Sequence, residues 1–293
     1  MRVKFEIGSG SGHPHVPVFV NGQGPFTFTL DTGAVATTIS KSMAETLGIP
    51  IREADKKFAA GIGGGRFPVA NATLDKLQIG NETLKNEEVL VIDFDRAFGT
   101  GAFTCGVIGH SLLKRYQLSV NYPARVLELR KTNGRPTGTR SKTAWNDFEY
   151  IQDTHLVVLP TLLNGQGPFH LVVDTGSGGT VITPQVAERL NLSREQAAGQ
   201  LKVVTPGSEG CTNGCRGLGG FADGYAVQLK SISVGSVTQD DPLVGVIDLR
   251  SVSPRGEVIR DGIIGYPFMK DLELVIDYPN KRFAFMKHAT PSS

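Results

Sequence analysis

The stretch that decides the fold is Leu30-Asp31-Thr32-Gly33-Ala34, in which an apolar run ends in a carboxylate, a hydroxyl and a glycine. A second copy, Val173-Asp174-Thr175-Gly176-Ser177, follows 143 residues later. The residues upstream repeat as well, because Asn21-Gly22-Gln23-Gly24-Pro25-Phe26 returns at the same offset as Asn164-Gly165-Gln166-Gly167-Pro168-Phe169. Any chemistry assigned to one copy must therefore account for both.

The repeat extends over most of both halves of the chain, which is the signature of a duplicated structural unit. At Pro17 and Pro160 the offset is still 143. At Val107-Ile108-Gly109 and Ile263-Ile264-Gly265 it has become 156. The second half therefore contains thirteen additional residues (156 − 143), and they precede Gly217.

Length and composition indicate two globular domains. The 293 residues are enough for two hydrophobic cores. Glycine makes up 36 of 293 residues, about 12% against a usual share of about 7%, and with 16 prolines this favours many turns and short strands. The net charge of +2 gives no electrostatic reason to expect nucleic acid as a partner. No apolar run reaches the roughly 18 residues of a membrane span.

Each half is predicted to consist mainly of strands. Residues 16–20 and 26–30 alternate between apolar and other side chains, as strands of a half-buried sheet do. The Asn-Gly pairs at 21–22 and 164–165 are strong signals for tight turns. Each half therefore begins with a hairpin that leads into Asp-Thr-Gly.

Two short helices are expected in each half. The first is predicted to start after the N-cap residues Ser40 and Thr183 and to end at Gly48 and Asn191. The second is expected after each Ile-Gly pair, through residues 112–115 and 268–270 in the respective halves.

Two Asp-Thr-Gly loops that face each other would bring the carboxyl groups of Asp31 and Asp174 close together. Like charges at short range cannot both ionise easily, so the pair would share one proton and supply a base and an acid at the same pH. Such a pair activates a water for attack on a peptide carbonyl while its protonated member supports the developing oxyanion. A lone Asp-Thr-Gly is more often a turn or N-cap aspartate, but its duplication favours catalysis.

With these elements in place, both halves resemble aspartic proteases of the retroviral (retropepsin) type, fused in tandem. The matching elements of each half are Asp-Thr-Gly, a glycine-rich segment and an Ile-Gly pair before a helix. The resemblance implies an all-β, bilobal acid-protease fold of two retropepsin-like lobes with pseudo-twofold symmetry. The lobes are expected at residues 1–131 and 147–293, with the polar segment 132–146 as linker.

The resemblance also implies the roles of individual residues. Asp31 and Asp174 would form the catalytic dyad of an endopeptidase, and the hydroxyls of Thr32 and Thr175 would brace the facing loops. The supporting residues are Thr32, Gly33, Ala34, Thr175, Gly176 and Ser177. The glycine-rich segments would be flaps over the substrate, formed by Gly61, Ile62, Gly63, Gly64, Gly217, Leu218, Gly219 and Gly220.

The expected substrate is a peptide or protein segment bound in extended conformation. A phosphate-binding interpretation of the glycine-rich segments is disfavoured, because neither is followed by a helix and a nearby lysine. The chain is expected to act as a monomer, with its halves in the place of a retropepsin dimer. Residues 1–7, 147–151 and 282–286 would then form the sheet that joins the halves.

The chain departs from the retropepsin pattern after each Asp-Thr-Gly and after each Ile-Gly. Ala34 follows the first aspartate loop and Ser177 the second. A Ser177 hydroxyl that donated to Asp174 would make Asp174 the more readily ionised member of the pair. Where viral relatives usually carry arginine, this chain has His110 and Tyr266, so the ion pair of that arginine must be replaced or absent.

Cysteine and histidine give no case for a metal or a cofactor, and none is expected. Cys211 and Cys215 lie in the insertion before the second flap, and their spacing allows either a small disulfide-bonded turn or two free thiols. Cys105 is expected to be a small buried residue. The pair in His13-Pro14-His15 is expected at the surface end of a strand, without a metal.

Two alternatives to a monomeric endopeptidase remain. The same fold is compatible with a catalytically weak peptide-binding module, and with a homodimer in which each half pairs with its like half in another chain. The first residues are too short and too charged for a signal peptide. The sequence as written therefore indicates a cytoplasmic protein, or a periplasmic or secreted one if an export signal was removed.

Overall fold

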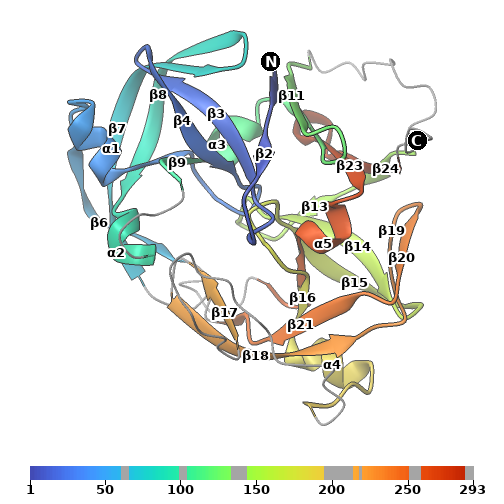
Figure 1. Cartoon of the computed structure of the whole chain (residues 1–293). Coiled ribbons are helices and arrows are strands. Elements are labelled where there is room, and N and C mark those ends of the chain that lie inside the picture. The colour runs from blue at the N-terminus through green and yellow to red at the C-terminus, as the bar shows by residue number, and fades with distance from the viewer. Residues whose placement is uncertain are drawn as a thin grey trace.

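The computed structural model describes residues 1–60, 66–98, 104–132, 144–194, 214–217, 220–250 and 259–287. Almost all regular structure in these residues is β, in two similar halves, as predicted from the sequence. In Figure 1 the first half lies at the upper left and the second at the lower right. The proposed linker lies mostly outside the described residues, which omit 133–143.

The first half is built on one eight-stranded sheet in the order β2-β3-β4-β9-β5-β8-β7-β6. An additional pairing between β3 and β7 closes this sheet on itself. The strands of the first half are β1 (Arg2–Lys4), β2 (Glu6–Ile7), β3 (Pro14–Val20), β4 (Gln23–Leu30), β5 (Thr38–Ser40), β6 (Arg52–Ala60), β7 (Arg66–Ile79), β8 (Glu82–Ile92), β9 (Gly106–Ile108), β10 (Gln117–Asn121) and β11 (Val126–Arg130).

The second half repeats this plan in a sheet with the order β17-β18-β21-β16-β22-β15-β14-β19-β20, with β13 paired to β14. Its strands are β12 (Asn146–Asp147), β13 (Glu149–Tyr150), β14 (Val157–Leu163), β15 (Gln166–Val173), β16 (Val181–Ile182), β17 (Gly214–Gly217), β18 (Gly220–Gln228), β19 (Ser231–Val234), β20 (Val237–Asp240), β21 (Leu243–Ile247), β22 (Gly262–Ile264), β23 (Leu272–Asp277) and β24 (Arg282–Lys287).

The predicted hairpins before each Asp-Thr-Gly are present. Asn21 and Asn164 adopt left-handed φ angles of 51° and 53°, and the following glycines also have positive φ, which is the backbone of a tight hairpin turn. The hairpins deliver β4 and β15 into the middle of their sheets. Each of these strands pairs in parallel with the strand that carries Ile-Gly, β9 in one half and β22 in the other.

The helices begin and end close to their predicted limits. Ser40 caps α1 (Lys41–Thr46) by accepting a hydrogen bond from the Met43 amide, and Gly48 ends it with a φ of 62°. Thr183 occupies the equivalent position before α4 (Pro184–Arg189), but its hydroxyl donates to the Arg260 carbonyl instead of capping the helix.

The second helix of each half is α3 (His110–Leu113) or α5 (Tyr266–Met269). Both start directly after the Ile-Gly pair and therefore two residues earlier than predicted. A further short helix, α2 (Phe94–Phe98), was not predicted.

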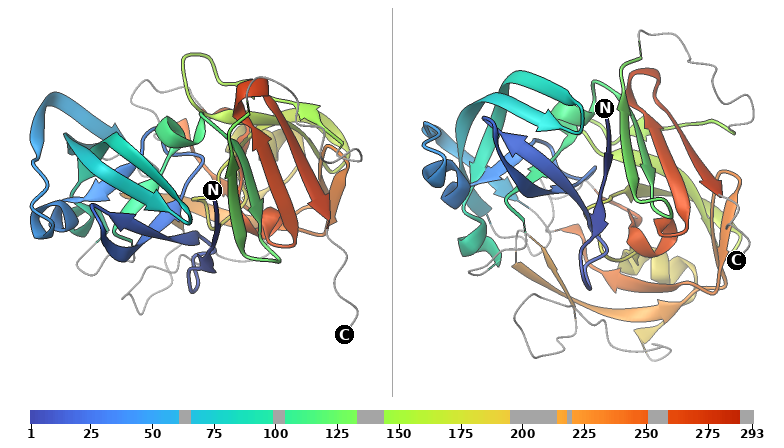
Figure 2. Two further views of the ribbon diagram at one scale, coloured as in Figure 1. Left: turned by 90° about the horizontal axis from the view of Figure 1, so that it is seen from above. Right: turned by 45° about the horizontal axis from the view of Figure 1, so that its top comes forward.

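A six-stranded sheet joins the halves, in the order β1-β11-β10-β23-β24-β12. Figure 2 shows its green strands, β10 and β11, beside the red strands β23 and β24. As expected, the sheet includes strands from near both ends of the chain and from the start of the second half. Its centre, however, is the pairing of β10 with β23. The neighbouring β2 and β13 instead pair with β3 and β14 of their own halves.

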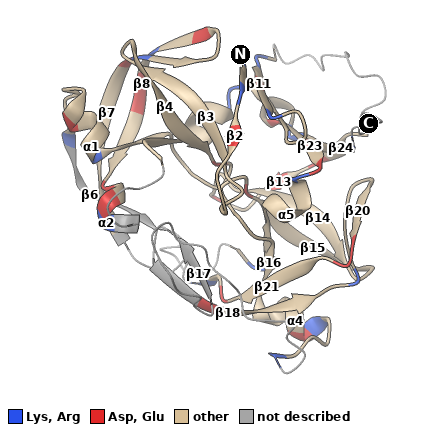
Figure 3. Cartoon of the chain, viewed as in Figure 1, with Lys and Arg blue, Asp and Glu red and all other residues tan. Residues whose placement is uncertain are grey.

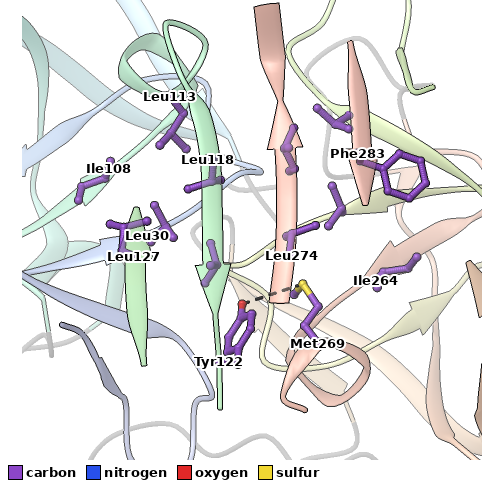
Figure 4. Close-up of a cluster of buried hydrophobic side chains, with 14 of the residues drawn as sticks. Leu30, Ile108, Leu113, Leu118, Tyr122, Leu127, Ile264, Met269, Leu274 and Phe283 are labelled. Atoms are coloured by element: carbon purple, nitrogen blue, oxygen red, sulfur yellow. Dashed lines mark hydrogen bonds between the residues drawn. The ribbon is translucent and has the colours of Figure 1, made fainter. Parts of the chain in front are cut away.

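The hydrophobic core is continuous across this joining sheet. Leu274 on β23 lies opposite Val120 on β10, and both are fully buried. Figure 4 shows Leu118 and Leu274 on these two neighbouring strands. The Tyr122 hydroxyl reaches the sulfur of Met269 in the other half, at 4.0 Å. Because apolar burial is the main stabilising contribution to folding, this shared core fixes how the two halves sit against each other.

Two expectations about single residues need correction. His13 lies directly before β3 but is half-buried instead of exposed, and desolvation lowers the pKa of its imidazole to about 4. Cys105 is free and only half-buried; it lies directly before β9 and packs against the core.

Among the described residues, Lys and Arg as well as Asp and Glu occur in both halves of the cartoon in Figure 3. None of the helices in the described part of the chain is long and apolar enough to cross a membrane.

We expect Leu274→Ala to lower the free energy of unfolding by about 2 to 5 kcal/mol, because it opens a cavity in the core between the halves. Urea unfolding measures this change. Leu243→Ala is the matched control, since Leu243 is 54% exposed and its loss should cost less than about 0.5 kcal/mol. Equal effects of the two substitutions would contradict a core that continues across the joining sheet.

Candidate active site

The two aspartates lie directly after the central strands β4 and β15. The preceding residues, Leu30 and Val173, are fully buried. The Asp31 amide donates to the Ile108 carbonyl at 3.1 Å, and the Asp174 amide donates to Ile264 at 3.0 Å. Each aspartate is thus fixed at the end of a strand by the Ile-Gly strand beside it, which explains why the two motifs occur together in each half.

Thr32 and Thr175 bind the two loops to each other by four reciprocal hydrogen bonds. The Thr32 hydroxyl donates to the Val173 carbonyl at 2.9 Å and accepts from the Thr175 amide at 3.0 Å. The Thr175 hydroxyl donates to the Leu30 carbonyl at 2.8 Å and accepts from the Thr32 amide at 3.1 Å. Both threonines are buried, so these bonds form away from competing water. The expected bracing is therefore present.

Gly33 and Gly176 let the carboxyl groups approach the opposite loop. A Cβ on Gly33 would lie 2.8 Å from the Asp174 Cγ, and a Cβ on Gly176 would lie 2.4 Å from the Asp31 Cγ. Such separations are shorter than any allowed contact, so any larger residue would push the aspartates apart.

The carboxyl groups of Asp31 and Asp174 are hydrogen bonded to each other. Both residues keep some solvent access, which an attacking water requires. Desolvation raises the pKa of both carboxyls, and the neighbouring charge of Asp31 raises the pKa of Asp174 further, well above its ordinary value. The pair therefore holds one proton over a range of pH.

The direction of this asymmetry is opposite to the prediction based on Ser177. The Ser177 hydroxyl donates to the Gly179 carbonyl at 2.8 Å and not to Asp174. Asp31 instead accepts two amide hydrogen bonds on Oδ1, from Gly33 at 2.8 Å and from Ala34 at 2.9 Å. The amide of Ser177, which corresponds to that of Ala34, donates to the backbone carbonyl of Asp174. Asp31 is therefore the more readily ionised member.

His110, which stands where viral relatives usually carry arginine, packs against three aromatic or imidazole side chains beside the first aspartate loop. The His110 ring contacts those of Tyr150, His155 and Tyr278, with centroids 5.8, 5.6 and 5.5 Å away. The His155 Nε2 lies 2.7 Å from the Gly33 carbonyl oxygen. Desolvation lowers the pKa of both histidines, that of His110 to about 4.

Sequence reasoning missed His155, because the residue belongs to no motif and reaches the site only through the packing of the two halves. In the second half, Tyr266 takes the place of His110, and its ring lies against Gly12 and Tyr122.

The remaining predicted site residues lie mostly at the edge of the described residues or beyond it. Residues 61–64 follow β6 and precede β7 but lie outside the described residues. Gly217 and Gly220 are paired at the ends of β17 and β18, while Leu218 and Gly219 are not described. The proposed disulfide also lies outside the described residues, because Cys211 does. Within the described residues, no group of three or more histidine, cysteine or acidic side chains is arranged to hold a metal ion.

Both halves of the chain match models of aspartyl protease families. The family model for the gag-polyprotein putative aspartyl protease matches residues 16–115, and the model for the aspartyl protease family matches residues 159–268. The chain thus contains two retropepsin-like aspartyl protease domains in tandem.

Among solved structures, a retropepsin-like aspartic protease from Rickettsia conorii is similar. It is 23% identical, and the match covers 44% of this chain and 87% of that chain, with a TM-score of 0.30. No curated protein matches the sequence.

We expect Thr32→Val to destabilise the protein by about 2 to 4 kcal/mol, because it leaves the Thr175 amide and the Val173 carbonyl buried without partners. Thr38→Val is the matched control, since Thr38 is equally buried and its hydroxyl has no hydrogen-bond partner among the described residues. This control should change stability by less than about 1 kcal/mol. Chemical denaturation that gave similar losses for both would contradict the bracing role.

We expect Asp174→Asn to stabilise the protein near neutral pH and to have little effect in acid. A carboxyl whose pKa is raised by folding lowers stability as the pH rises from its unfolded to its folded pKa, because the folded state holds the proton more tightly. Urea unfolding between pH 4 and pH 8 measures this slope. The exposed Asp75→Asn serves as control. If the free energy of unfolding changed with pH in Asp174→Asn as it does in the wild type, the raised pKa of Asp174 would not contribute to the pH dependence of stability.

Proposed function

We propose that this protein is an aspartic endopeptidase in which Asp31 and Asp174, one from each half, activate a water molecule. The hydrogen-bonded pair of carboxyl groups supports the proposal most directly, because a shared proton provides a base and an acid at one place. Membership of the aspartyl protease family implies peptide substrates.

In the proposed reaction, ionised Asp31 takes a proton from the water as its oxygen attacks the carbonyl carbon of the scissile peptide. Asp174 gives its proton to the carbonyl oxygen, so a neutral tetrahedral intermediate forms. Asp31 then protonates the leaving nitrogen, the C–N bond breaks, and Asp174 recovers its proton. The asymmetry of the site supports these roles, since Asp31 accepts two amide hydrogen bonds on one oxygen and Asp174 accepts one, from Gly176.

We further propose that the glycine-rich segments close over the substrate as flaps. The first, 61–64, follows β6, and the second, 217–220, includes the paired ends of β17 and β18. Residues 1–131 and 147–293 would form the lobes and 132–146 the linker. An extended peptide would lie between the lobes and the flaps.

The experiment is cleavage of a mixed peptide library by the wild type and by Asp31→Asn and Asp174→Asn. Each substitution should lower kcat/KM by at least about 100-fold, because it removes the base or the acid. Asp75→Asn, an exposed carboxylate exchanged in the same way, should cleave like the wild type. Full turnover in either dyad variant would overturn the assignment.

Two alternatives have their own outcomes. Peptide binding without cleavage by the wild type would favour a peptide-binding module. Sedimentation distinguishes the homodimer, which would have twice the mass of the 31.4 kDa chain. The pairing of β10 with β23 within one chain favours the monomer, because it already brings both aspartates together.

A further inference from the structure

His155 contacts the first aspartate loop at a peptide group that also contacts the dyad. Its Nε2 lies 2.7 Å from the Gly33 carbonyl oxygen, which can only accept. Nε2 must therefore carry a proton and donate it. That carbonyl belongs to the peptide between Gly33 and Ala34, and the N–H of the same peptide donates to the Asp31 Oδ1 at 2.9 Å.

A peptide group that accepts a hydrogen bond at its oxygen becomes a stronger donor at its nitrogen, because the two bonds polarise the same delocalised group. A donor directed at a carboxylate favours the ionised carboxylate. The two hydrogen bonds therefore act in series. His155 donates to the Gly33–Ala34 peptide, and this peptide donates to Asp31, the aspartate proposed as the base.

The loop that carries His155 is held in place by its own hydrogen bonds. Between β13 and β14, the Ile151 amide donates to the Leu156 carbonyl, and the Thr154 hydroxyl donates to the Ile151 carbonyl and accepts from the Leu156 amide. Together with the packing of the His110 ring, these bonds restrict the position of the imidazole.

The equivalent loop of the first half has the same backbone but lacks the histidine. There the Gly8 amide donates to His13, and the Ser11 hydroxyl donates to Gly8 and accepts from the His13 amide. The position of His155 falls on Gly12, at an offset of 143. A Cβ on Gly12 would lie 2.4 Å from the Tyr266 ring, so the ring occupies the place of a side chain. Position 12 therefore offers no side chain equivalent to the His155 donor.

We propose that His155 is a positioning residue, which holds the Gly33–Ala34 peptide so that its N–H group stabilises the ionised carboxylate of Asp31. It does not touch the substrate in this role. The inference rests on the proposed function for its catalytic meaning, but the hydrogen-bond chain can be tested without any turnover.

Several titratable groups lie around His155 and the neighbouring His110 ring, and any pH study must consider them. They are Asp31 and Asp174 from the dyad, His110 and Lys114 at α3, Tyr150 on β13, and Tyr278 in the 3-10 turn at Tyr278–Asn280. His155 is neutral near pH 7, since desolvation lowers its pKa despite the Gly33 contact and the charge of Asp31. Protonation in acid would retain the Nε2 donor.

The test compares His155→Phe with His155→Gln in the full chain. Phenylalanine keeps a ring next to His110 but cannot donate, whereas the glutamine amide can replace the Nε2 donor. Carbon-13 NMR of the aspartate carboxyls should show the lower apparent pKa of the dyad rising by about 0.3 to 0.6 pH unit in the phenylalanine variant. The glutamine variant should recover at least half of this shift. His170→Phe, an exposed histidine on β15, should leave the titration unchanged.

A folded His155→Phe variant whose dyad titrates like the wild type would overturn the proposal. Should that variant fail to fold, nitrogen-15 spectra of the wild type near pH 7 show which imidazole nitrogen of His155 carries the proton. A proton on Nε2 supports the proposal, and a proton on Nδ1 overturns it. If the carboxyl titration shifts as expected while the wild type cleaves no peptide, the proposed function fails and the positioning role stands.

Discussion

The structure depends on holding two carboxyl groups against each other where neither is well solvated. Such a contact is unfavourable by itself, because desolvation and like charge both oppose ionisation. The features around it offset this cost. Thr32 and Thr175 tie the loops together, Gly33 and Gly176 make room, and backbone amides of the loops supply donors. The shared core and the β10–β23 pairing then keep the halves from separating.

A site made from two copies of one motif need not be symmetric. The loops agree in their strands, their threonines and their glycines, and they differ at the residue after each glycine. The Ala34 amide donates to the Asp31 carboxylate at 2.9 Å as well as to the Asp31 backbone carbonyl at 3.4 Å, while the Ser177 amide donates to the Asp174 backbone carbonyl at 3.2 Å. His155 has no side-chain counterpart at Gly12. These differences act in the same direction, since each favours the ionised form of Asp31.

Fusion of the halves into one chain makes such divergence possible. In a symmetric dimer, a substitution appears on both sides of the site at once. In this chain, the glycine and histidine at the equivalent positions 12 and 155 are encoded separately. One loop can therefore specialise as the environment of a base and the other as the environment of an acid.

The sequence by itself determined the architecture, because the offset of 143 between the Asp-Thr-Gly copies shows a duplication and the alternating apolar residues show strands. The caps at Ser40 and Gly48 and the Asn-Gly turns were also predictable, since the causes of these structures lie within a few residues. The pairing of Asp31 with Asp174 followed from the motif and the resemblance.

Only the tertiary structure decided which aspartate is the more readily ionised, and the local argument from Ser177 was wrong. A hydroxyl next to an aspartate has several acceptors within reach, and here the Gly179 carbonyl is the one it binds. The contacts around Asp31 instead include His155, which lies 122 residues from Gly33 in the chain and contacts the Gly33 carbonyl. Contacts at that separation follow from the packing of whole lobes, and no spacing within the sequence encodes them.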